Sequence, residues 1–582
     1  MKIAIIDSGV DKKHDALKNA DIKGCSLKVI NGHVEKEEDF NDTLGHGTAV
    51  FYLIDKFVEN DEIYNFKIFF DSMSLQMDEL NRILKYIYYN YDFDIINISF
   101  GALYSEKLEE LQCICEEFFK KETFIVAAYD NYGAISYPAA CNYVFGVSAE
   151  DTVGKEIKVQ KGIVNIVGAE KFYKVPWVNP KYNIVKGNSF LCAEATGFIC
   201  NQIKENIEFR KMLVTIFHSC SEDVFSEIAW LKSVKKAAVF PFNKEMHSLA
   251  ANEDMLEFEI VDYYHVKHSG LVNTRINKKM PYISNDKIIK NIDNINYDNI
   301  DFFVLGHCGE ISKLTGIDYK KEILSECVRR NIKVYSFDNT EFNSAQVYAP
   351  MFKRSSIIQR YGKMYMIRQP IVSVIGTSSA QGKFTLQLYF RKKLLEAGYK
   401  LGQLGTEPEA YLLGMDITFP IGYNSSINLT NTEMLLAVNQ MLQEISSKDV
   451  ELIITGSQAG LVPIDLSNIK YSTNRHQIYF QGISPDVIVL CINPYDRLSF
   501  IEKNIRAAES MSNGKVIGIV CYTMDVDKSW RGAYGKKVHI SEKKIIYLRE
   551  QIYTHFGLKM YMLDKNEELD MLIRSIINYL GR

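Results

Sequence analysis

Short apolar runs alternate with amphipathic stretches along the first 205 residues of the chain. Five runs have the length of buried strands: Ile3–Ile6, Phe66–Phe70, Ile95–Ser99, Phe124–Ala128 and Val144–Ser148. Helical patterns separate these runs, and strands that alternate with helices along a chain form parallel sheets. We therefore predict an α/β domain with a parallel sheet over residues 1–205.

The pattern changes near residue 207. From Ile207 to Val234 the chain is amphipathic without strand-like runs, which predicts a helical linker over 206–234. The remaining apolar runs, which begin again at residue 237, predict a small Rossmann-like α/β domain over 235–369 and a further α/β domain over 370–582. The runs are Ala237–Phe242, Phe302–Glu310, Val334–Asn339, Val372–Ile375, Leu452–Thr455, Val487–Ile492 and Val516–Cys521.

Composition narrows the class of protein. Hydrophobic residues make up 47% and charged residues 24% of the chain, as in ordinary globular proteins. The net charge of −4, without a long basic run, argues against nucleic acid as a partner. No signal-peptide core and no apolar stretch of about 18 residues occurs, so we expect a cytoplasmic protein without a membrane span. The 11 cysteines lack paired zinc spacing and are expected to be reduced and buried.

Four separate segments carry residues suited to acyl-transfer chemistry. Asp7 ends the first apolar run, His46 lies between two glycines at a helix start, Asn131 follows an apolar run, and Ser189 lies at a helix start after Gly187-Asn188. A serine hydroxyl is a poor nucleophile until an imidazole takes its proton, and a carboxylate orients that imidazole. An asparagine side chain and a backbone N–H can stabilise the oxyanion that forms.

These motifs resemble the subtilase family in residue type, spacing and order, which runs Asp, His, Asn, Ser over residues 1–205. The resemblance implies a serine endopeptidase with Asp7, His46 and Ser189 as its triad and Asn131 in its oxyanion hole. Ser99, Phe100 and Gly101 look like the family's substrate-pairing segment, whose backbone would take the bound peptide as an extra strand.

The sequence departs from the family pattern at two places. Tyr129-Asp130 stands where the family usually has a Gly before the Asn, and Glu194 lies where a Pro commonly follows the Ser. Both departures bear on specificity and rate rather than on the triad itself.

A second constellation lies between a predicted strand and a predicted helix, as in a phosphate-binding loop. The residues expected to bind a nucleotide are Gly376, Thr377, Ser378, Gly382, Lys383, Phe384 and Thr385. Lys383 would pair with the β and γ phosphate oxygens of ATP or GTP, and Thr385 would hold Mg²⁺. One extra residue between Gly376 and Gly382, and Phe384 before Thr385, distinguish this loop from the standard Walker spacing. The alternative is a plain strand–turn–helix with glycines for packing.

Residues 235–582 resemble a two-part family, an open α/β domain followed by a variant P-loop domain. Its members include enzymes acting on amino-acid substrates and clostridial-type peptide maturation proteins. Glu407–Glu409 and Gly422–Ser426 look like the loops that would line its ligand site. A cytoplasmic subtilase fused to such a module resembles the maturation systems of ribosomally made, bacteriocin-type peptides, so we expect a precursor peptide as partner.

Two further patterns have a structural interpretation. Asn493–Asp496 superficially resembles the guanine-reading motif of GTPases, but Pro494 replaces its usual Lys. His307-Cys308 resembles a thiol–imidazole pair, yet adjacent residues at a strand end point to opposite faces. Neither is expected to be catalytic.

Three functions therefore remain open from the sequence. The first is a bifunctional maturation enzyme that cleaves a leader from a precursor peptide and uses a nucleotide in a second step. The second is a housekeeping protease regulated by a nucleotide. The third is a non-proteolytic, ATP-dependent acyl or amino-acid transferase whose N-terminal half only binds peptide. Assembly into a homo-oligomer also remains open.

Overall fold

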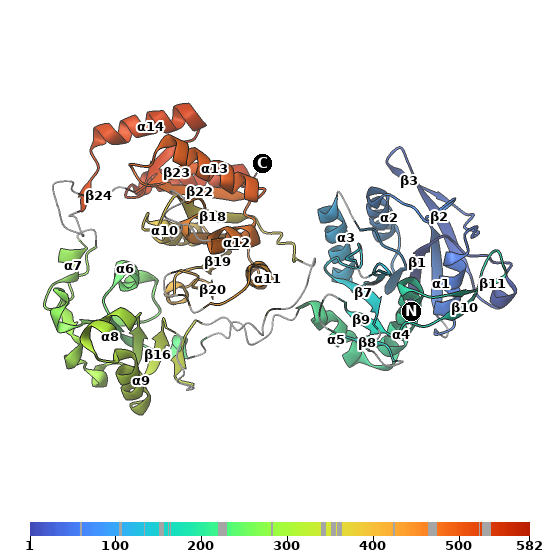
Figure 1. The fold of residues 1–582 in the computed structure, drawn as a ribbon, viewed down its shortest axis with the longest axis horizontal. Helices are drawn as coiled ribbons and strands as arrows, with labels where there is room; N and C mark the ends of the chain where they lie inside the picture. The colour runs from blue at the N-terminus through green and yellow to red at the C-terminus, as the bar shows by residue number, and fades with distance from the viewer. Residues whose placement is uncertain are drawn as a thin grey trace. The chain divides into compact units, whose positions relative to one another are not determined.

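The computed structural model (Figure 1) divides into two compact units, Met1–Cys220 with Ile358–Met366 and Ser221–Ile357 with Ile367–Arg582. Each unit has its own sheets and hydrophobic core. The structure describes residues 1–582 apart from 59–60, 104–106, 133, 151–155, 161, 163, 219–227, 229, 281–282, 339–344, 351–356, 358–363, 423–424, 426, 464–473, 523, 527–536 and 582.

The first unit is built on a nine-stranded sheet in the order β3-β2-β4-β1-β5-β6-β7-β9-β8. All neighbouring strands are parallel except β2 with β3 and β8 with β9. The strands are β1 (Lys2–Asp7), β2 (Lys23–Ile30), β3 (His33–Glu37), β4 (Glu62–Lys67), β5 (Ile95–Ile98), β6 (Phe124–Ala128), β7 (Val144–Ala149), β8 (Lys158–Val159) and β9 (Ile166–Gly168). A separate hairpin pairs β10 (Tyr173–Pro176) with β11 (Tyr182–Val185).

Helices cover both faces of this sheet because alternate strand residues are buried on opposite sides. In β1, Ile3 and Ile5 pack with α1, α4 and α5, whereas Ala4 and Ile6 pack with α2 and α3. The helices are α1 (His46–Asp55), α2 (Met77–Asn90), α3 (Leu108–Lys120), α4 (Asn188–Glu205) and α5 (Ile207–His218). The central strands are thereby shielded from water, and the charged residues of β1, Lys2 and Asp7, lie at its two ends.

The second unit begins with a six-stranded parallel sheet in the order β14-β13-β12-β15-β16-β17. Its strands are β12 (Lys236–Phe240), β13 (Glu259–His265), β14 (Ile289–Asn291), β15 (Phe302–Leu305), β16 (Lys333–Ser336) and β17 (Val347–Tyr348). Its helices are α6 (Lys244–Ala251), α7 (Ile276–Lys279), α8 (Gly309–Thr315) and α9 (Tyr319–Arg329).

A seven-stranded parallel sheet follows, in the order β20-β19-β21-β18-β22-β23-β26. Its strands are β18 (Ile371–Gly376), β19 (Leu401–Gly405), β20 (Ile417–Thr418), β21 (Leu452–Gly460), β22 (Val487–Ile492), β23 (Lys515–Cys521) and β26 (Met560–Met562), with a hairpin of β24 (Met524–Val526) and β25 (Lys537–His539). Its helices are α10 (Lys383–Glu396), α11 (Asn431–Ser446), α12 (Asn474–Ile483), α13 (Leu498–Met511), α14 (Glu542–Phe556) and α15 (Asn566–Leu580).

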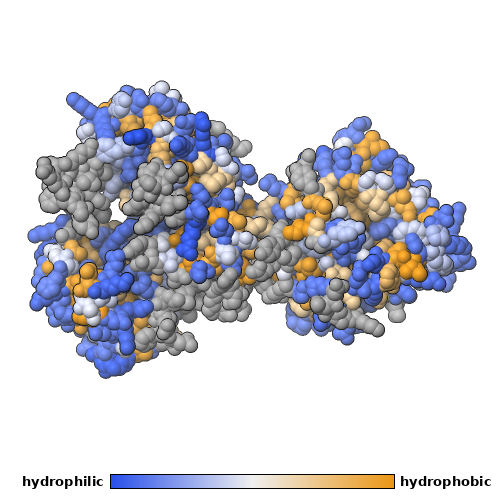
Figure 2. All heavy atoms as spheres, in the orientation of Figure 1, coloured by the Kyte–Doolittle hydropathy of each residue, from blue (hydrophilic) through white to orange (hydrophobic). Residues whose placement is uncertain are grey.

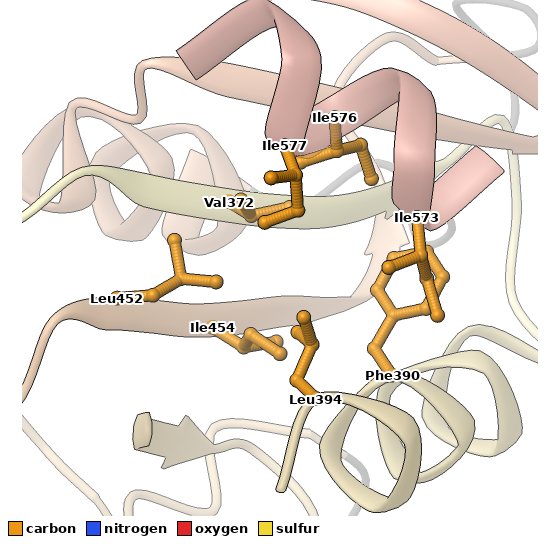
Figure 3. A pocket seen from close by; sticks show the side chains of 8 residues that line it. All are labelled: Val372, Phe390, Leu394, Leu452, Ile454, Ile573, Ile576 and Ile577. Atoms are coloured by element: carbon orange, nitrogen blue, oxygen red, sulfur yellow. The ribbon is translucent and has the colours of Figure 1, made fainter. Parts of the chain in front are cut away.

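The central strand β18 is buried on both faces. Val372 and Val374 pack with α10 and α15, whereas Ile371 and Ile375 pack on the other side. Figure 3 shows isoleucines of α15 directed toward Val372 and the side chains of α10, around a small gap in this layer. All eight side chains that line the gap are apolar, so it offers a ligand no hydrogen bond and belongs to the core.

The two sheets of the second unit share one core. Leu388 of α10 and Leu412 belong to the same hydrophobic cluster as Val239 of β12 and Tyr335 of β16. The Tyr335 hydroxyl also donates a hydrogen bond of 2.8 Å to the carbonyl oxygen of Pro408. The carboxyl-end loops of the second sheet are therefore held against the first.

The predicted α/β class with parallel sheets is confirmed, and several strand boundaries need correction. β4 begins at Glu62, four residues before the predicted Phe66, and the run from Phe302 contains both β15 and the start of α8. Strands β2, β13 and β19 had no counterpart in the prediction. The domain boundaries stay predictions, and part of the predicted linker, residues 219–227 and 229, lies outside the described residues.

Within the part of the chain that the structure describes, no helix is long and apolar enough to cross a membrane. On the face drawn in Figure 2, hydrophobic residues are interspersed among hydrophilic ones over both units.

We predict that α5 is part of the first unit's core although it lies beyond residue 205. Phe217 is 3% exposed, and its ring packs edge-on against Phe145 at 4.8 Å between centroids and against Phe119 at 5.4 Å. Phe217→Ala should cost about 3–5 kcal/mol of stability, because it leaves a cavity. Hydrogen-exchange mass spectrometry should show faster exchange in β6 and β7.

The matched control is Phe172→Ala, because Phe172 is 72% exposed. Equal exchange rates in the two variants would show that α5 contributes nothing to this core.

Candidate functional site

Asp7 is delivered by the central strand β1, at the carboxyl edge of the first unit's sheet. It is 1% exposed, and its Oδ1 accepts a hydrogen bond of 2.8 Å from the Ser8 backbone N–H. Nδ1 of His46 lies 2.8 Å from Oδ1 and 3.0 Å from Oδ2 of Asp7. Because the carboxylate is acceptor-only, this contact places the imidazole proton on Nδ1 and leaves Nε2 as the basic nitrogen.

His46 is the first residue of α1 and lies between Gly45 and Gly47. The local backbone requires a glycine on each side of His46. Gly45 has a φ of 91°, in the left-handed region that favours glycine. A Cβ on Gly47 would lie 2.3 Å from the carbonyl oxygen of Gly9, so only glycine lets α1 approach β1 this closely. Burial disfavours the charged form of His46, but the charge and hydrogen bond of Asp7 outweigh burial, so the pKa of His46 is raised.

The turn before α1 is organised by Asp42, which sequence reasoning missed. Asp42 is 1% exposed, and its carboxylate accepts hydrogen bonds from the backbone N–H groups of Leu44, Gly45 and Thr48, each at 2.9 Å. The Thr48 hydroxyl donates a fourth, at 2.7 Å. These bonds hold the backbone on both sides of His46. An acidic residue shortly before a helix start is the sequence signal that could have found it.

Ser189 and Asn131 meet at the N-terminus of α4. The backbone N–H of Asn188 donates to Asn131 Oδ1 at 2.8 Å, which leaves the Nδ2 amide group of Asn131 as a donor for a ligand. The side chain of Asn188 donates to the carbonyl oxygens of Tyr129 and Asp130, at 3.1 and 2.9 Å. The loop after β6 is therefore fastened to the first turn of α4.

The same helical turn lies beside His46. The ring of Phe190, the residue after Ser189, is 5.4 Å from the His46 ring between centroids. The structure thus gathers Asp7, His46, Asn131 and the turn that carries Ser189. No hydrogen bond joins Ser189 to His46 within the described residues, and such catalytic contacts often form fully only with substrate bound.

The predicted substrate-pairing residues follow β5, next to the strand that carries Asp7. The Ser99 hydroxyl is buried and donates to Asn97 Oδ1 at 2.9 Å, and Phe100 packs edge-on against Phe69 at 4.8 Å. Gly101 is exposed, and a Cβ there would lie 3.0 Å from the Ser136 hydroxyl. The segment continues into an antiparallel bridge between Ala102 and Tyr137.

The two departures from the family pattern have structural partners. Glu194 accepts hydrogen bonds from Lys171 Nζ at 2.6 Å and from the Tyr173 hydroxyl at 2.7 Å, and so ties β10 to α4. The ring of Tyr129 is buried against Gly146, where a Cβ would lie 2.4 Å from it. Both side chains serve packing around α4 and β7.

The second predicted site is a strand–loop–helix in which Lys383 is the first residue of α10. Lys383 is 5% exposed, and its Nζ donates to the Ser378 carbonyl oxygen at 2.6 Å. Burial lowers the pKa of Lys383 to about 8. Gly382 has a φ of 74°, and a Cβ on Gly376 would lie 2.4 Å from Gln381 Oε1. The backbone conformation therefore favours glycine at 382, and a Cβ at 376 would displace the Gln381 side chain that accepts a hydrogen bond from the Ser378 N–H.

The segment Asn493–Asp496 supports this loop. The Thr377 hydroxyl donates to Asp496 Oδ2 at 2.5 Å, and Asn493 Nδ2 donates to the Ser378 hydroxyl at 3.0 Å. The resemblance to a base-reading motif thus corresponds to a structural role at the loop.

The two residues after Lys383 point to different surroundings. Phe384 packs against the core shared by the two sheets, and Thr385 is exposed on α10. The metal-binding role of Thr385 stays a prediction. In the described residues, no group of three or more His, Cys, Asp and Glu side chains forms a metal site. Of the loop predicted at Gly422–Ser426, Tyr423, Asn424 and Ser426 lie outside the described residues.

A parallel α/β sheet that brings an aspartate, a histidine and a helix-start serine to one edge defines the first unit as subtilisin-like. The model of the subtilase family matches residues 1–227, so the chain begins with a subtilase domain. A second model, described as a P-loop domain of unknown function, DUF1611_C, matches residues 360–538. Both predicted resemblances, to a subtilase and to a variant P-loop domain, are confirmed.

Solved structures resemble the two parts separately. A cold-adapted subtilisin-like serine proteinase is 18% identical, with a TM-score of 0.30, and the match covers 37% of this chain and 81% of that chain. The epidermin leader peptide processing serine protease (EpiP) from Staphylococcus aureus is 18% identical, with a TM-score of 0.31, and the match covers 39% of this chain and 70% of that chain. A DUF1611 family protein from Anabaena variabilis is 13% identical, with a TM-score of 0.44, and the match covers 59% of this chain and 99% of that chain. No curated protein matches the chain.

We predict that Asp42 holds α1 in position. Asp42→Ala removes the acceptor for four donors, three of them in buried hydrogen bonds, and should lower the stability of the first unit by about 3 kcal/mol or more. Hydrogen exchange of peptides that cover α1 should accelerate, and the midpoint of thermal unfolding should fall.

Asp39→Ala is the matched control, since Asp39 is exposed on the same loop and accepts one bond, from the Asn41 N–H at 3.0 Å. If Asp42→Ala unfolds at the same temperature as this control, the four bonds do not hold the turn.

Proposed function

We propose that the first unit is an active serine endopeptidase with Asp7, His46 and Ser189 as its triad. The observation that carries the proposal is the hydrogen bond between the buried Asp7 and the partly buried His46, next to the turn of α4 that holds Ser189. The raised pKa of His46 supports the same assignment, because the imidazolium formed during catalysis is stabilised by Asp7.

The chemistry follows from these groups. His46 Nε2 takes the hydroxyl proton of Ser189 as its oxygen bonds to the carbonyl carbon of the scissile peptide. Asn131 Nδ2 and the Ser189 N–H donate to the resulting oxyanion. The C–N bond then breaks, and the amine leaves with the proton held by His46. Water, deprotonated by the same nitrogen, releases the acid and restores Ser189.

The substrate that we propose is a ribosomally made precursor peptide, from which the protease removes a leader. Ser99, Phe100 and Gly101 would pair with the peptide backbone as an added strand. The resemblance of the whole chain to peptide maturation systems supports this choice of substrate.

We further propose that the second unit binds ATP or GTP with Mg²⁺ for a second step. The glycine-dependent loop, the helix start at α10 and the buried Lys383 fit a polyphosphate, which would replace the Ser378 carbonyl oxygen as the partner of Nζ. The β and γ phosphate oxygens would take this contact, and Thr385 is the magnesium ligand that we propose.

For the protease, Ser189→Ala should abolish labelling by a fluorophosphonate probe and lower peptide cleavage about 10⁴-fold or more, because the nucleophile is lost. The measurement is mass spectrometry of a peptide library, or of a candidate precursor peptide, incubated with the full chain. Ser72→Ala, an exposed serine in the same unit, should label and cleave like the parent. Cleavage by Ser189→Ala at the parental rate would exclude this triad.

For the nucleotide site, Lys383→Ala should weaken binding of ATP or GTP by about 1.5–3 kcal/mol, measured by calorimetry on the full chain. Since the pKa of Lys383 is lowered to about 8, parental affinity should fall as the pH rises above 8 and the ammonium loses its proton. The variant should lack this fall.

Lys393→Ala, near the other end of α10 and paired with Glu396, is the control and should bind as the parent does. If the parent protein binds neither ATP nor GTP, the proposed nucleotide site is refuted.

A further inference from the structure

A polar pocket lies between the two sheets of the second unit and has a cavity volume of about 40 Å³. Its lining comes from segments far apart in the sequence: the start of α6, the loops after β15, β16, β19 and β20, and the end of β21. The polar side chains that line it are Lys244, Glu245, His307, Glu407, Ser425 and Gln458. Convergence of titratable groups at strand ends in a pocket marks a candidate ligand site.

His307 in this pocket is oriented by Asp338. Nδ1 of His307 lies 2.6 Å from Asp338 Oδ1, and Asp338 Oδ2 accepts from the Cys308 N–H at 3.3 Å. The contact assigns the proton to Nδ1 and leaves Nε2 as the acceptor. The Cys308 thiol is buried and donates to the Gly306 carbonyl oxygen, so the imidazole acts without it.

The charges around His307 favour its protonated form. Burial disfavours the cation, but Asp338, with the more distant Glu245 and Glu407, outweighs burial and raises the pKa of His307. His307 lowers the pKa of Asp338 in turn, against the effect of burial, with a smaller contribution from Lys320. His307 can therefore hold a proton that a bound molecule gives up.

The pocket adjoins the phosphate-binding loop. Gln458 lies two residues before Gly460, which pairs with Gly376 at the end of β18. The side chain of Gln458 donates to Glu407 Oε2 at 3.0 Å, and Glu407 interacts electrostatically with Lys383. A group bound beside Glu407 would thus lie near the terminal phosphate of a nucleotide held by Lys383.

The lining places the carboxylates Glu245 and Glu407 beside Lys244 and His307, and the carboxylates indicate which groups of a ligand would bind next to them. Burial raises the pKa of Glu407, which lines the pocket. It also raises that of Glu409, which follows Pro408 of the lining but is not itself a lining residue; Glu409 is 1% exposed and has a buried Oε2 without a hydrogen-bond partner in the described structure. Carboxylates in such surroundings favour hydrogen-bond donors over anions. The fitting ligand is a small polar molecule with hydroxyl or amino groups.

We propose that this pocket is the acceptor site of a phosphoryl transfer in which His307, positioned by Asp338, is the general base. The inference rests on the nucleotide binding proposed above. The oxygen or nitrogen of the acceptor bonds to the γ-phosphorus of the nucleoside triphosphate and gives its proton to His307 Nε2. The bond between the γ-phosphorus and the β–γ bridging oxygen breaks, and the nucleoside diphosphate leaves with that electron pair.

Water as the acceptor gives a test that needs no identified substrate. We would measure phosphate release from ATP and GTP with Mg²⁺ by the full chain between pH 5 and 9, alongside nucleotide affinity by calorimetry. The parental rate should rise with pH as His307 loses its proton, above the ordinary histidine value of about 6.5. His307→Gln should lower the rate about 100-fold or more with affinity unchanged within about twofold.

The variant Asp338→Asn tests whether Asp338 positions His307 for catalysis or only contributes to the stability of the fold. Loss of the carboxylate should move the rise in rate to lower pH, as the pKa of His307 falls, an effect that a merely structural role of Asp338 would not produce. His268→Gln, in an exposed turn of the same unit, is the matched control and should leave both rate and pH profile unchanged. The midpoint of thermal unfolding shows whether each variant is folded. If His307→Gln does not fold, the pH profile of Asp338→Asn tests the role of His307.

The outcomes distinguish the two proposals. Nucleotide binding without hydrolysis, or hydrolysis that neither variant alters, overturns the role of His307 and leaves the nucleotide site standing. Absence of nucleotide binding by the parent removes the nucleotide site, and this inference falls with it.

Discussion

The burial of parallel strands on both faces is the constraint on which both units depend. Strands such as β1 and β18 are covered by helices on each side, and the charged residues of these two strands, Lys2 and Asp7, stand only at strand ends. The backbone there turns toward a helix whose first N–H groups also need partners. Asp7, the phosphate-binding loop and His307 all occupy such positions. Chemistry is thus concentrated at the carboxyl edges of the sheets.

The same pairing of a carboxylate with Nδ1 of a histidine occurs in both units, with Asp7 buried and Asp338 partly buried. Asp7 with His46 and Asp338 with His307 have contacts of 2.8 and 2.6 Å. In each case burial opposes the charged imidazole, and the paired carboxylate together with more distant carboxylates outweighs burial, so that the pKa of each histidine is raised. The two pairs arise on different sheets and from different loops. The similarity has a physical cause, because a carboxylate can only accept hydrogen bonds and therefore keeps the proton of the imidazole on the nitrogen that faces it.

The sequence predicted the parallel α/β class, the subtilase domain and the P-loop domain because their signals are local, whereas the roles of the individual site residues stay predictions. A strand that ends in Asp7, or a glycine loop between a strand and Lys383, can be recognised within about ten residues. Strand β19 was missed because Leu401–Gly405 contains two glycines. A Cβ on Gly402 would lie 2.2 Å from Ile445 of α11, so the glycine reflects close helix packing that only tertiary structure reveals. Asp338 and His307 lie 31 residues apart and meet only in the folded sheet.

The core shared by the sheets of the second unit also governs how this part of the chain could be divided. Leu388 and Leu412 of the second sheet's layer pack with Val239 and Tyr335 of the first. Cutting the chain near residue 370 would expose these side chains on both fragments. Each fragment would expose an apolar surface, and we expect it to aggregate or to reassociate with the other fragment. Fragment complementation, rather than independent truncation, is therefore the natural way to take this unit apart.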